Sequence, residues 1–124
     1  FSLVSLDGRR ATLSHIEIAS RDRVGKYGVD IAAFEDFLGH IAFFSPDTGA
    51  IIIDEIGKME CISDRFKKLL KTILDSEKPV IATIASTGEG IIKEIKKRDD
   101  VELFVMTQNN RNSLLPEILK LVHF

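Results

Sequence analysis

Tryptophan is absent from this 124-residue chain, and cysteine occurs only once, at Cys61. A single cysteine excludes a disulfide within the chain and fits a reducing compartment, so we expect the cytoplasm. No apolar run approaches the roughly 18 residues of a membrane span, so we expect no membrane partner. The formal charge of −2 argues against general nucleic-acid binding, and nothing in the composition requires an obligate protein partner.

The sequence also lacks a phosphate-binding loop of the form G-x-x-x-x-G-K-[ST]. In that loop the glycines admit phosphate oxygens and the hydroxyl reaches Mg²⁺. Gly25–Lys26 does not fit the pattern, because Ser20 stands at the first glycine and Tyr27 at the hydroxyl position. Gly57–Lys58 fails likewise, since Met59 follows the lysine. Neither glycine–lysine pair can therefore be such a loop.

The strongest motif is the stretch Ala50–Glu60, A-I-I-I-D-E-I-G-K-M-E. Its isoleucine run Ile51–Ile53 is typical of a strand buried on both faces of a parallel sheet. Asp54 and Glu55 follow, at the carboxyl edge where open α/β sheets bind ligands. Such a strand ending in D-E has the form of a Walker B motif, whose Asp holds Mg²⁺ and whose Glu orients or deprotonates the attacking water. An acidic residue that only ends the strand is the alternative interpretation.

The motif D-E-I-G-K-M-E is followed by an apolar-periodic helix. Together they resemble the small P-loop nucleoside-triphosphatase family of the cancer-related nucleoside-triphosphatase type. Similar segments are Arg23–Asp30 (R-V-G-K-Y-G-V-D) with Phe34–Glu35, Lys78–Ile84 (K-P-V-I-A-T-I) and Asn110–Leu119. The resemblance covers nearly the whole chain. It implies an enzyme that uses Mg²⁺ to hydrolyse nucleoside triphosphates, ATP, GTP and others, to the diphosphate and phosphate with little base selectivity.

The alternation of patterns predicts an α/β fold with a mostly parallel sheet and helices on both faces. An N-terminal β-hairpin is expected from Phe1–Leu6 and Arg10–Leu13 around an Asp-Gly turn. For the next stretch, Ser14–Arg23, a third edge strand and an extended loop remain open. Strands are predicted over Ala50–Ile53, Val80–Ile84 and Val101–Met106.

Helices are predicted between these strands from apolar residues that recur every three or four positions. Asp30 is expected to cap the first helix, which should pack on the sheet, and Ser63 the second. A short helix should carry Ile91, Ile92 and Ile95. In the last helix we expect Asn112 or Ser113 as the cap, Pro116 in the first turn, and an inward face made of Leu115, Ile118, Leu119 and Val122.

The chain begins at Phe1, within a strand-like run. In the resembled family a first strand, the phosphate loop and a first helix precede this point. We therefore expect residues 1–124 to form a single domain, the C-terminal two thirds of a P-loop NTPase domain.

Asp54 and Glu55 are the candidate catalytic residues, with Asp54 as the metal ligand. The hydroxyl of Thr83 is a candidate sensor of the γ-phosphate or of the attacking water, and an ordinary β-branched strand residue is the alternative. Asn110 and Arg111 are candidates for contacting the base, with turn residues and a surface charge as the alternative. Lys26, in the R-V-G-K-Y-G-V-D segment, is a further candidate for nucleotide binding.

The absent phosphate loop leaves two other classes of function open. One is a catalytically inactive nucleotide-binding or scaffolding remnant. The other is an α/β enzyme that uses Asp54 and Glu55 as a metal pair without a phosphate loop. The loop Ala85–Gly90 offers no cation for a transition state, because Ala85 and Ser86 stand where the resembled family has basic or imidazole side chains.

Overall fold

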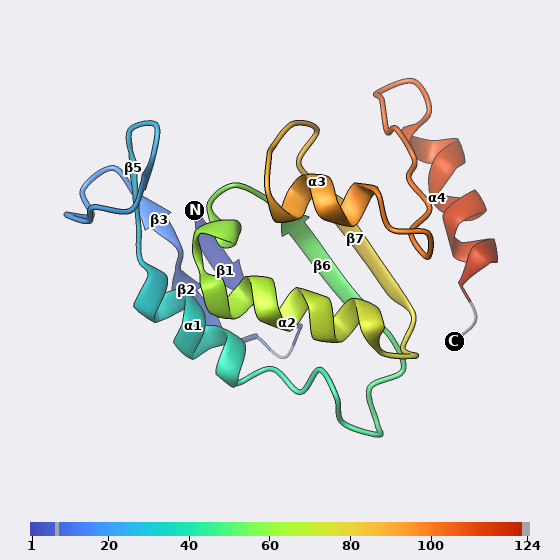
Figure 1. Cartoon of the computed structure of the whole chain (residues 1–124), viewed down its shortest axis with the longest axis horizontal. Helices are drawn as coiled ribbons and strands as arrows, with labels where there is room; N and C mark the ends of the chain where they lie inside the picture. The colour runs from blue at the N-terminus through green and yellow to red at the C-terminus, as the bar shows by residue number, and fades with distance from the viewer. Residues whose placement is uncertain (7, 123–124) are drawn as a thin grey trace.

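The computed structural model describes residues 1–6 and 8–122 of the chain, with strands in three small sheets and two helices over one side of the pair of parallel strands (Figure 1). In chain order the elements are β1 (Ser2–Val4), β2 (Arg10–Thr12), β3 (Ser14–His15), β4 (Arg23–Val24), β5 (Tyr27–Val29), α1 (Ile31–Gly39), β6 (Ile51–Ile56), a 3-10 helix (Glu60–Ile62), α2 (Asp64–Asp75), β7 (Val80–Ile84), α3 (Ile91–Lys96) and α4 (Arg111–Leu121). Among the helices of the described residues, none has the length and apolarity to cross a membrane.

The N-terminal hairpin is confirmed. β1 and β2 pair antiparallel, with Ser2 opposite Thr12, and Gly8 turns the chain at a φ of +90°. The preceding turn residue, Asp7, lies outside the described residues. In the stretch whose structure was left open, Ser14 and His15 form a short strand, β3, that pairs with β5. The residues between β3 and β4 are turns and loops.

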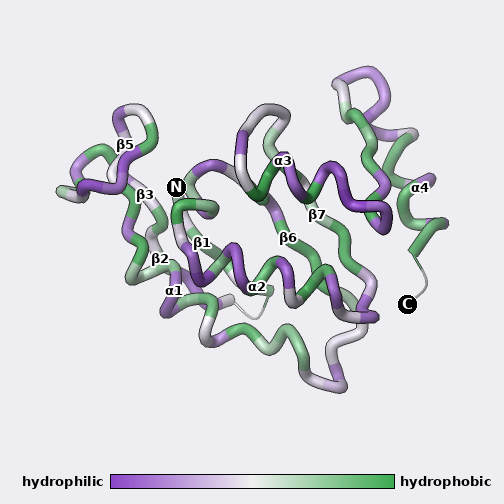
Figure 2. Tube along the Cα trace, viewed as in Figure 1, coloured by the Kyte–Doolittle hydropathy of each residue, from purple (hydrophilic) through white to green (hydrophobic). Residues whose placement is uncertain are grey.

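The two longest strands, β6 and β7, form a parallel pair. Ile51 lies opposite Val80 and Ile53 opposite Ala82, and an irregularity follows before Ile56. Apolar residues run along both strands, in the centre of Figure 2. The predicted end of the strand at Ile53 is wrong: β6 continues through Asp54 and Glu55 to Ile56. The reason is that β6 pairs with β7 again at Ile56, opposite Ile84, so the strand continues through the irregularity at Asp54 and Glu55.

The helices α1 and α2 begin at the two predicted caps. Asp30 Oδ1 accepts a hydrogen bond from Ala33 N at 2.9 Å, and Ser63 Oγ accepts one from Phe66 N at 3.0 Å. The same serine hydroxyl, which is almost fully buried, donates to Glu35 Oε2 at 2.6 Å. One buried side chain therefore starts α2 and connects it to α1.

The core lies between α1, α2, α3, the carboxyl end of β6 and the N-terminal elements. Its buried members come from nearly every part of the fold: Leu13, Val29, Phe34, Leu38, Ile56, Phe66, Leu70, Ile91 and Ile95. α1 lies against β2 and α2. It therefore contacts the hairpin and a helix, and its Phe34 and Leu38 belong to the same core cluster as Ile56 of β6.

One face of the parallel pair is much more exposed than predicted. α2 and α3 lie over one face of β6 and β7 (Figure 1). On β6, Ile51 is 3% exposed, whereas the next residue, Ile52, is 63% exposed. Successive side chains of a strand point to opposite faces. The isoleucine run is therefore buried on one face only among the described residues.

The C-terminal part differs most from the sequence predictions. Val101–Met106 forms no strand, because no other described strand lies alongside it to accept its hydrogen bonds; Val105 is 80% exposed. The last helix begins at Arg111 instead of after Asn112 or Ser113, so Pro116 lies within it. Its buried residue is Leu114, while the predicted inward residues Leu115 and Leu119 are largely exposed.

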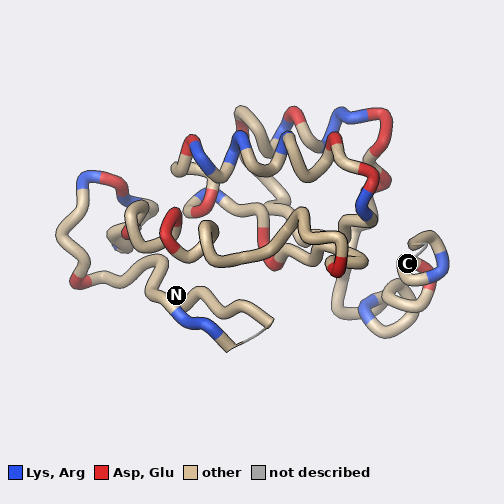
Figure 3. The backbone as a smooth tube through the Cα atoms, turned by 90° about the horizontal axis from the view of Figure 1, so that it is seen from below, with Lys and Arg blue, Asp and Glu red and all other residues tan. Residues whose placement is uncertain are grey.

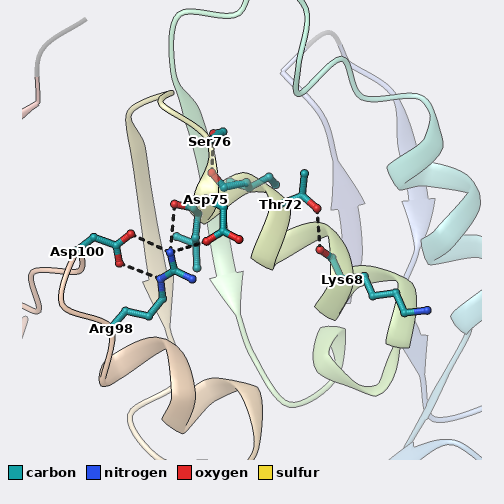
Figure 4. Close-up of polar contacts among 8 residues, drawn as sticks. Lys68, Thr72, Asp75, Ser76, Arg98 and Asp100 are labelled. Carbon is teal, nitrogen blue, oxygen red and sulfur yellow. Dashed lines mark hydrogen bonds and ion pairs between the residues drawn. The ribbon is translucent and has the colours of Figure 1, made fainter.

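Arg98 connects the ends of α2 and α3 (Figure 4). Its Nη2 donates to Asp75 Oδ1 and to Asp100 Oδ2, both at 2.8 Å, and its Nε donates to Asp100 Oδ1 at 2.8 Å. The hydrogen bonds from the guanidinium lower the pKa of Asp100. Because both carboxylates are exposed, the cluster orients the connection more than it stabilises the fold.

Substitution of Leu70 by alanine tests the assignment of the core. Leu70 is fully buried, and Leu70→Ala should lower the free energy of unfolding by roughly 2 to 5 kcal/mol because it leaves a cavity. Denaturant unfolding measures the loss. The matched control is Leu6→Ala, since Leu6 is 99% exposed and its truncation should cost less than about 0.5 kcal/mol. Equal losses in the two variants would contradict this core.

Candidate functional site

The parallel pair brings Asp54 and Thr83 together at an irregularity in its pairing. Ile53 lies opposite Ala82 and Ile56 opposite Ile84, so Asp54 and Glu55 of β6 stand against the single residue Thr83 of β7. Thr83 Oγ1 donates a hydrogen bond to Asp54 Oδ1 at 2.6 Å. Both side chains are exposed. The candidate metal ligand thus has a fixed partner and one carboxylate oxygen left for another ligand.

Glu55 is exposed and lies next to a tight turn that leaves β6. Gly57 N donates to Glu60 Oε2 at 3.1 Å across this turn. A Cβ atom added at Gly57 would lie 2.7 Å from that oxygen and 3.3 Å from Glu55 Cγ and Oε1. A side chain at this position would therefore displace the Glu60 carboxylate from Gly57 and crowd that of Glu55.

Glu60 is the residue of this site that the sequence analysis did not assign. Burial raises the pKa of Glu60 above its ordinary value of 4.5; hydrogen bonds from backbone N–H groups oppose the shift, and the charges of Glu55 and Asp54 add to it. The signal for its role was present in the motif: a glutamate three residues after a glycine that begins a helical turn is typical of a capping contact.

Cys61 follows Glu60 and is half-buried. Burial raises the pKa of its thiol to about 11, and the charge of Glu60 contributes. The nucleophilic form of cysteine is the thiolate. Cys61 is therefore protonated at neutral pH and does not act as a nucleophile beside the carboxylates.

The donor set at Asp54 and Thr83 fits Mg²⁺. In residues 1–6 and 8–122 no three His, Cys, Asp or Glu side chains come together as a protein-only metal site. Mg²⁺ does not need such a site, because it binds one or two carboxylates and completes its shell with water and phosphate oxygens. The carboxylate of Asp54 and the hydroxyl of Thr83 are both oxygen donors of the kind that Mg²⁺ prefers.

The other predicted site residues lie in loops with contacts of their own. Lys26 is in the turn between β4 and β5, with Nζ 5.5 Å from the centroid of the Tyr27 ring. The amide of Asn110 accepts from Thr107 N at 2.7 Å and donates to Val105 O at 2.8 Å. Arg111 is exposed at the start of α4. The structure gives none of Lys26, Asn110 and Arg111 a hydrogen bond or ion pair with Asp54.

A lysine not singled out by the sequence holds the loop after β7. Lys96 Nζ, from α3, donates to Ala85 O at 2.7 Å and to Ser86 O at 3.0 Å.

Charges of both signs are interspersed along the helices rather than separated (Figure 3). The open depression between α2 and α3, about 390 Å³, is accordingly lined by Asp64 and Glu94 as well as by lysines. It presents no field of a single sign to a ligand.

Comparison with known proteins gives consistent results. Residues 1–119 match the model of a family described as NTPase. The chain is 40% identical over 125 residues to nucleoside-triphosphatase THEP1 of Thermotoga maritima, covering all of this chain and 72% of that protein. It is 33% identical over 136 residues to the human cancer-related nucleoside-triphosphatase, covering 98% of this chain and 72% of that protein.

A solved structure supports the same assignment. The crystal structure of THEP1 from the hyperthermophile Aquifex aeolicus matches with a TM-score of 0.85 and 31% sequence identity, covering 99% of this chain and 76% of that chain. The class is therefore the α/β fold of P-loop NTPases, as predicted. The chain belongs to the NTPase family, and the resemblance seen in its motifs is confirmed.

The raised pKa of Glu60 predicts a pH-dependent difference in stability. A carboxyl group with a raised pKa binds its proton more tightly in the folded state, so the parent protein should lose stability as pH rises above about 4.5. Glu60→Gln has no such proton to lose. Its free energy of unfolding, measured by urea titration, should therefore rise relative to that of the parent between about pH 4 and pH 7. A constant difference over this range would contradict the assignment.

Proposed function

We propose that the protein to which these residues belong hydrolyses nucleoside triphosphates, ATP, GTP and others, to the diphosphate and phosphate with Mg²⁺. The observation that carries the proposal is the hydrogen bond from Thr83 to Asp54 beside Glu55, at the carboxyl end of a parallel strand pair. Ligands of α/β sheets bind at that end. The names of the relatives agree with it.

Asp54 holds Mg²⁺ in this proposal, directly or through water. The hydrogen bond from Thr83 keeps one carboxylate oxygen occupied, so the other faces the ion. When bound, Mg²⁺ supplies positive charge to the phosphate oxygens as negative charge shifts toward the leaving group. The protein's task is to keep the carboxylate in place before the nucleotide arrives.

Glu55 orients the attacking water and accepts its proton. The water oxygen forms a bond to the γ-phosphorus, and the bond from that phosphorus to the β–γ bridging oxygen breaks. The products are the nucleoside diphosphate and phosphate. An exposed carboxylate one residue after the metal ligand suits this role, because it reaches the water without displacing the ion.

Holding the triphosphate requires more than these carboxylates, and the present sequence contains no phosphate loop. We propose that residues 1–124 form the C-terminal two thirds of the domain and act together with such a loop.

Asn110 and Arg111 contact the base, with little selectivity, and Lys26 contributes to nucleotide binding. A reducing compartment, the cytoplasm, suits the single half-buried cysteine. An inactive remnant is not favoured.

Replacing Glu55 by glutamine tests the water-activating role. Glu55→Gln keeps the size of the side chain but cannot accept a proton, so turnover should fall by about 10²- to 10⁴-fold. Binding of Mg-nucleotide, measured by isothermal titration calorimetry, should persist. The matched control is Glu17→Gln, at an exposed position outside the site. Turnover of Glu55→Gln equal to that of the control would remove Glu55 from the mechanism.

Replacing Asp54 by asparagine tests the metal ligand. Asp54→Asn keeps an oxygen for the hydrogen bond from Thr83 but loses the negative charge that attracts Mg²⁺. The Mg²⁺ concentration for half-maximal activity should therefore rise at least about tenfold. Asp47→Asn, at an exposed loop position, serves as the control. An unchanged Mg²⁺ dependence would show that the ion is held elsewhere.

A further inference from the structure

The turn that follows Glu55 is a single helical turn with only one side-chain cap. Cys61 N donates to Gly57 O at 3.0 Å, which places Gly57 at the start of the turn. Glu60, the third residue after it, returns its carboxylate to Gly57 N at 3.1 Å. This is one half of a capping box. Glycine has no side chain to form the other half, so the start of the turn depends on Glu60 alone.

The same glycine lies between the side chains of Glu55 and Glu60. The space at Gly57 where a Cβ would stand is 2.7 Å from Glu60 Oε2 and 3.3 Å from Glu55 Oε1. Both side chains therefore lie close to the backbone of Gly57. Any movement of the Gly57 backbone changes the room available to Glu55.

Glu60 itself is held in place from its other end. Ser63 N donates to Glu60 O at 3.1 Å, and Ser63 then caps α2, the helix that packs on the sheet. The side chain of Ser63 is almost fully buried. Ser63 thus fixes the end of the turn to the core, and the hydrogen bond between Glu60 and Gly57 N fixes its start.

We propose that Glu60 is a positioning residue for hydrolysis: through its hydrogen bond to Gly57 N it keeps the turn closed and Glu55 at the place where it meets the attacking water. This inference rests on the proposed function of Glu55. Displacing a reacting group by about 1 Å can reduce a rate by about 10²-fold, so a small opening of the turn has a measurable cost.

The test compares Glu60→Ala, which removes the hydrogen bond, with Glu60→Gln, which keeps an oxygen for Gly57 N. Steady-state hydrolysis is measured below the melting temperature of both variants. In Glu60→Ala, kcat should fall about 10- to 100-fold with KM within about twofold of the parent. Glu60→Gln should recover most of kcat. Glu117→Ala, on exposed α4, is the control for removing a glutamate elsewhere.

Two results of this comparison would overturn the proposal. One is a kcat for Glu60→Ala equal to that of the control. The other is a Glu60→Gln variant as slow as Glu60→Ala, because the hydrogen bond to Gly57 would then not be what matters. A general loss of structure is recognised separately. It lowers the melting temperature and the active fraction, and it does not produce a difference in kcat between Glu60→Ala and Glu60→Gln.

A double variant asks whether Glu60 acts through Glu55. Once Glu55→Gln has removed the base, adding Glu60→Ala should slow hydrolysis by less than about twofold, since residues that act as a unit are not additive. A further tenfold loss would show that Glu60 acts elsewhere and would overturn the proposal.

Hydrogen exchange of the Gly57 amide separates this inference from the proposed function. Measured by NMR without nucleotide, exchange at Gly57 should be faster in Glu60→Ala than in the parent and slow again in Glu60→Gln. Unchanged exchange in Glu60→Ala would overturn the contact, whatever the enzyme hydrolyses. If the exchange results hold but Glu55→Gln keeps full turnover, the proposed function fails, and the catalytic role of Glu60 fails with it.

Discussion

The parallel pairing of β6 with β7 is the interaction on which the site depends. Thr83 lies beside Asp54 at the irregularity in this pairing, and the last pair, Ile56 with Ile84, carries Ile56 into the core while the acidic pair stays exposed. A shift of one residue would reverse the faces, directing Asp54 at the helices and Ile56 at solvent. The energetic preference for a buried Ile56 therefore also maintains the orientation of the carboxylates.

Helix α2 stabilises that arrangement at both of its ends. At its start, Ser63 caps the helix, donates to Glu35 of α1 and follows the turn that Glu60 closes. At its other end, Arg98 joins Asp75 to the segment after α3. Leu70 and Ile73 are fully buried between these ends, and Leu70 belongs to the same core cluster as Ile56 of β6. The exposed candidate carboxylates thus lie on a strand that well-packed elements support, as the proposed function requires.

Sequence patterns were most reliable where local chemistry and burial agree. The caps Asp30 and Ser63 were predicted because a side-chain oxygen satisfies backbone N–H groups at a helix start, whatever lies nearby. The apolar face of α2 was predicted for the same kind of reason. The predictions failed for Val101–Met106 and for the inward face of α4, where the outcome depends on which elements lie alongside and not on local preference.

The sequence by itself determined the family, the α/β alternation and the candidate pair Asp54–Glu55, because these depend on residue types at short, regular spacings. The contact between Thr83 and Asp54, the close approach of Glu55 and Glu60 to Gly57, and the hydrogen bond from Gly57 to Glu60 were decided only by the tertiary structure. The register of two strands and the closure of a turn juxtapose groups by distance in space. The spacing of residues along the chain does not predict that distance.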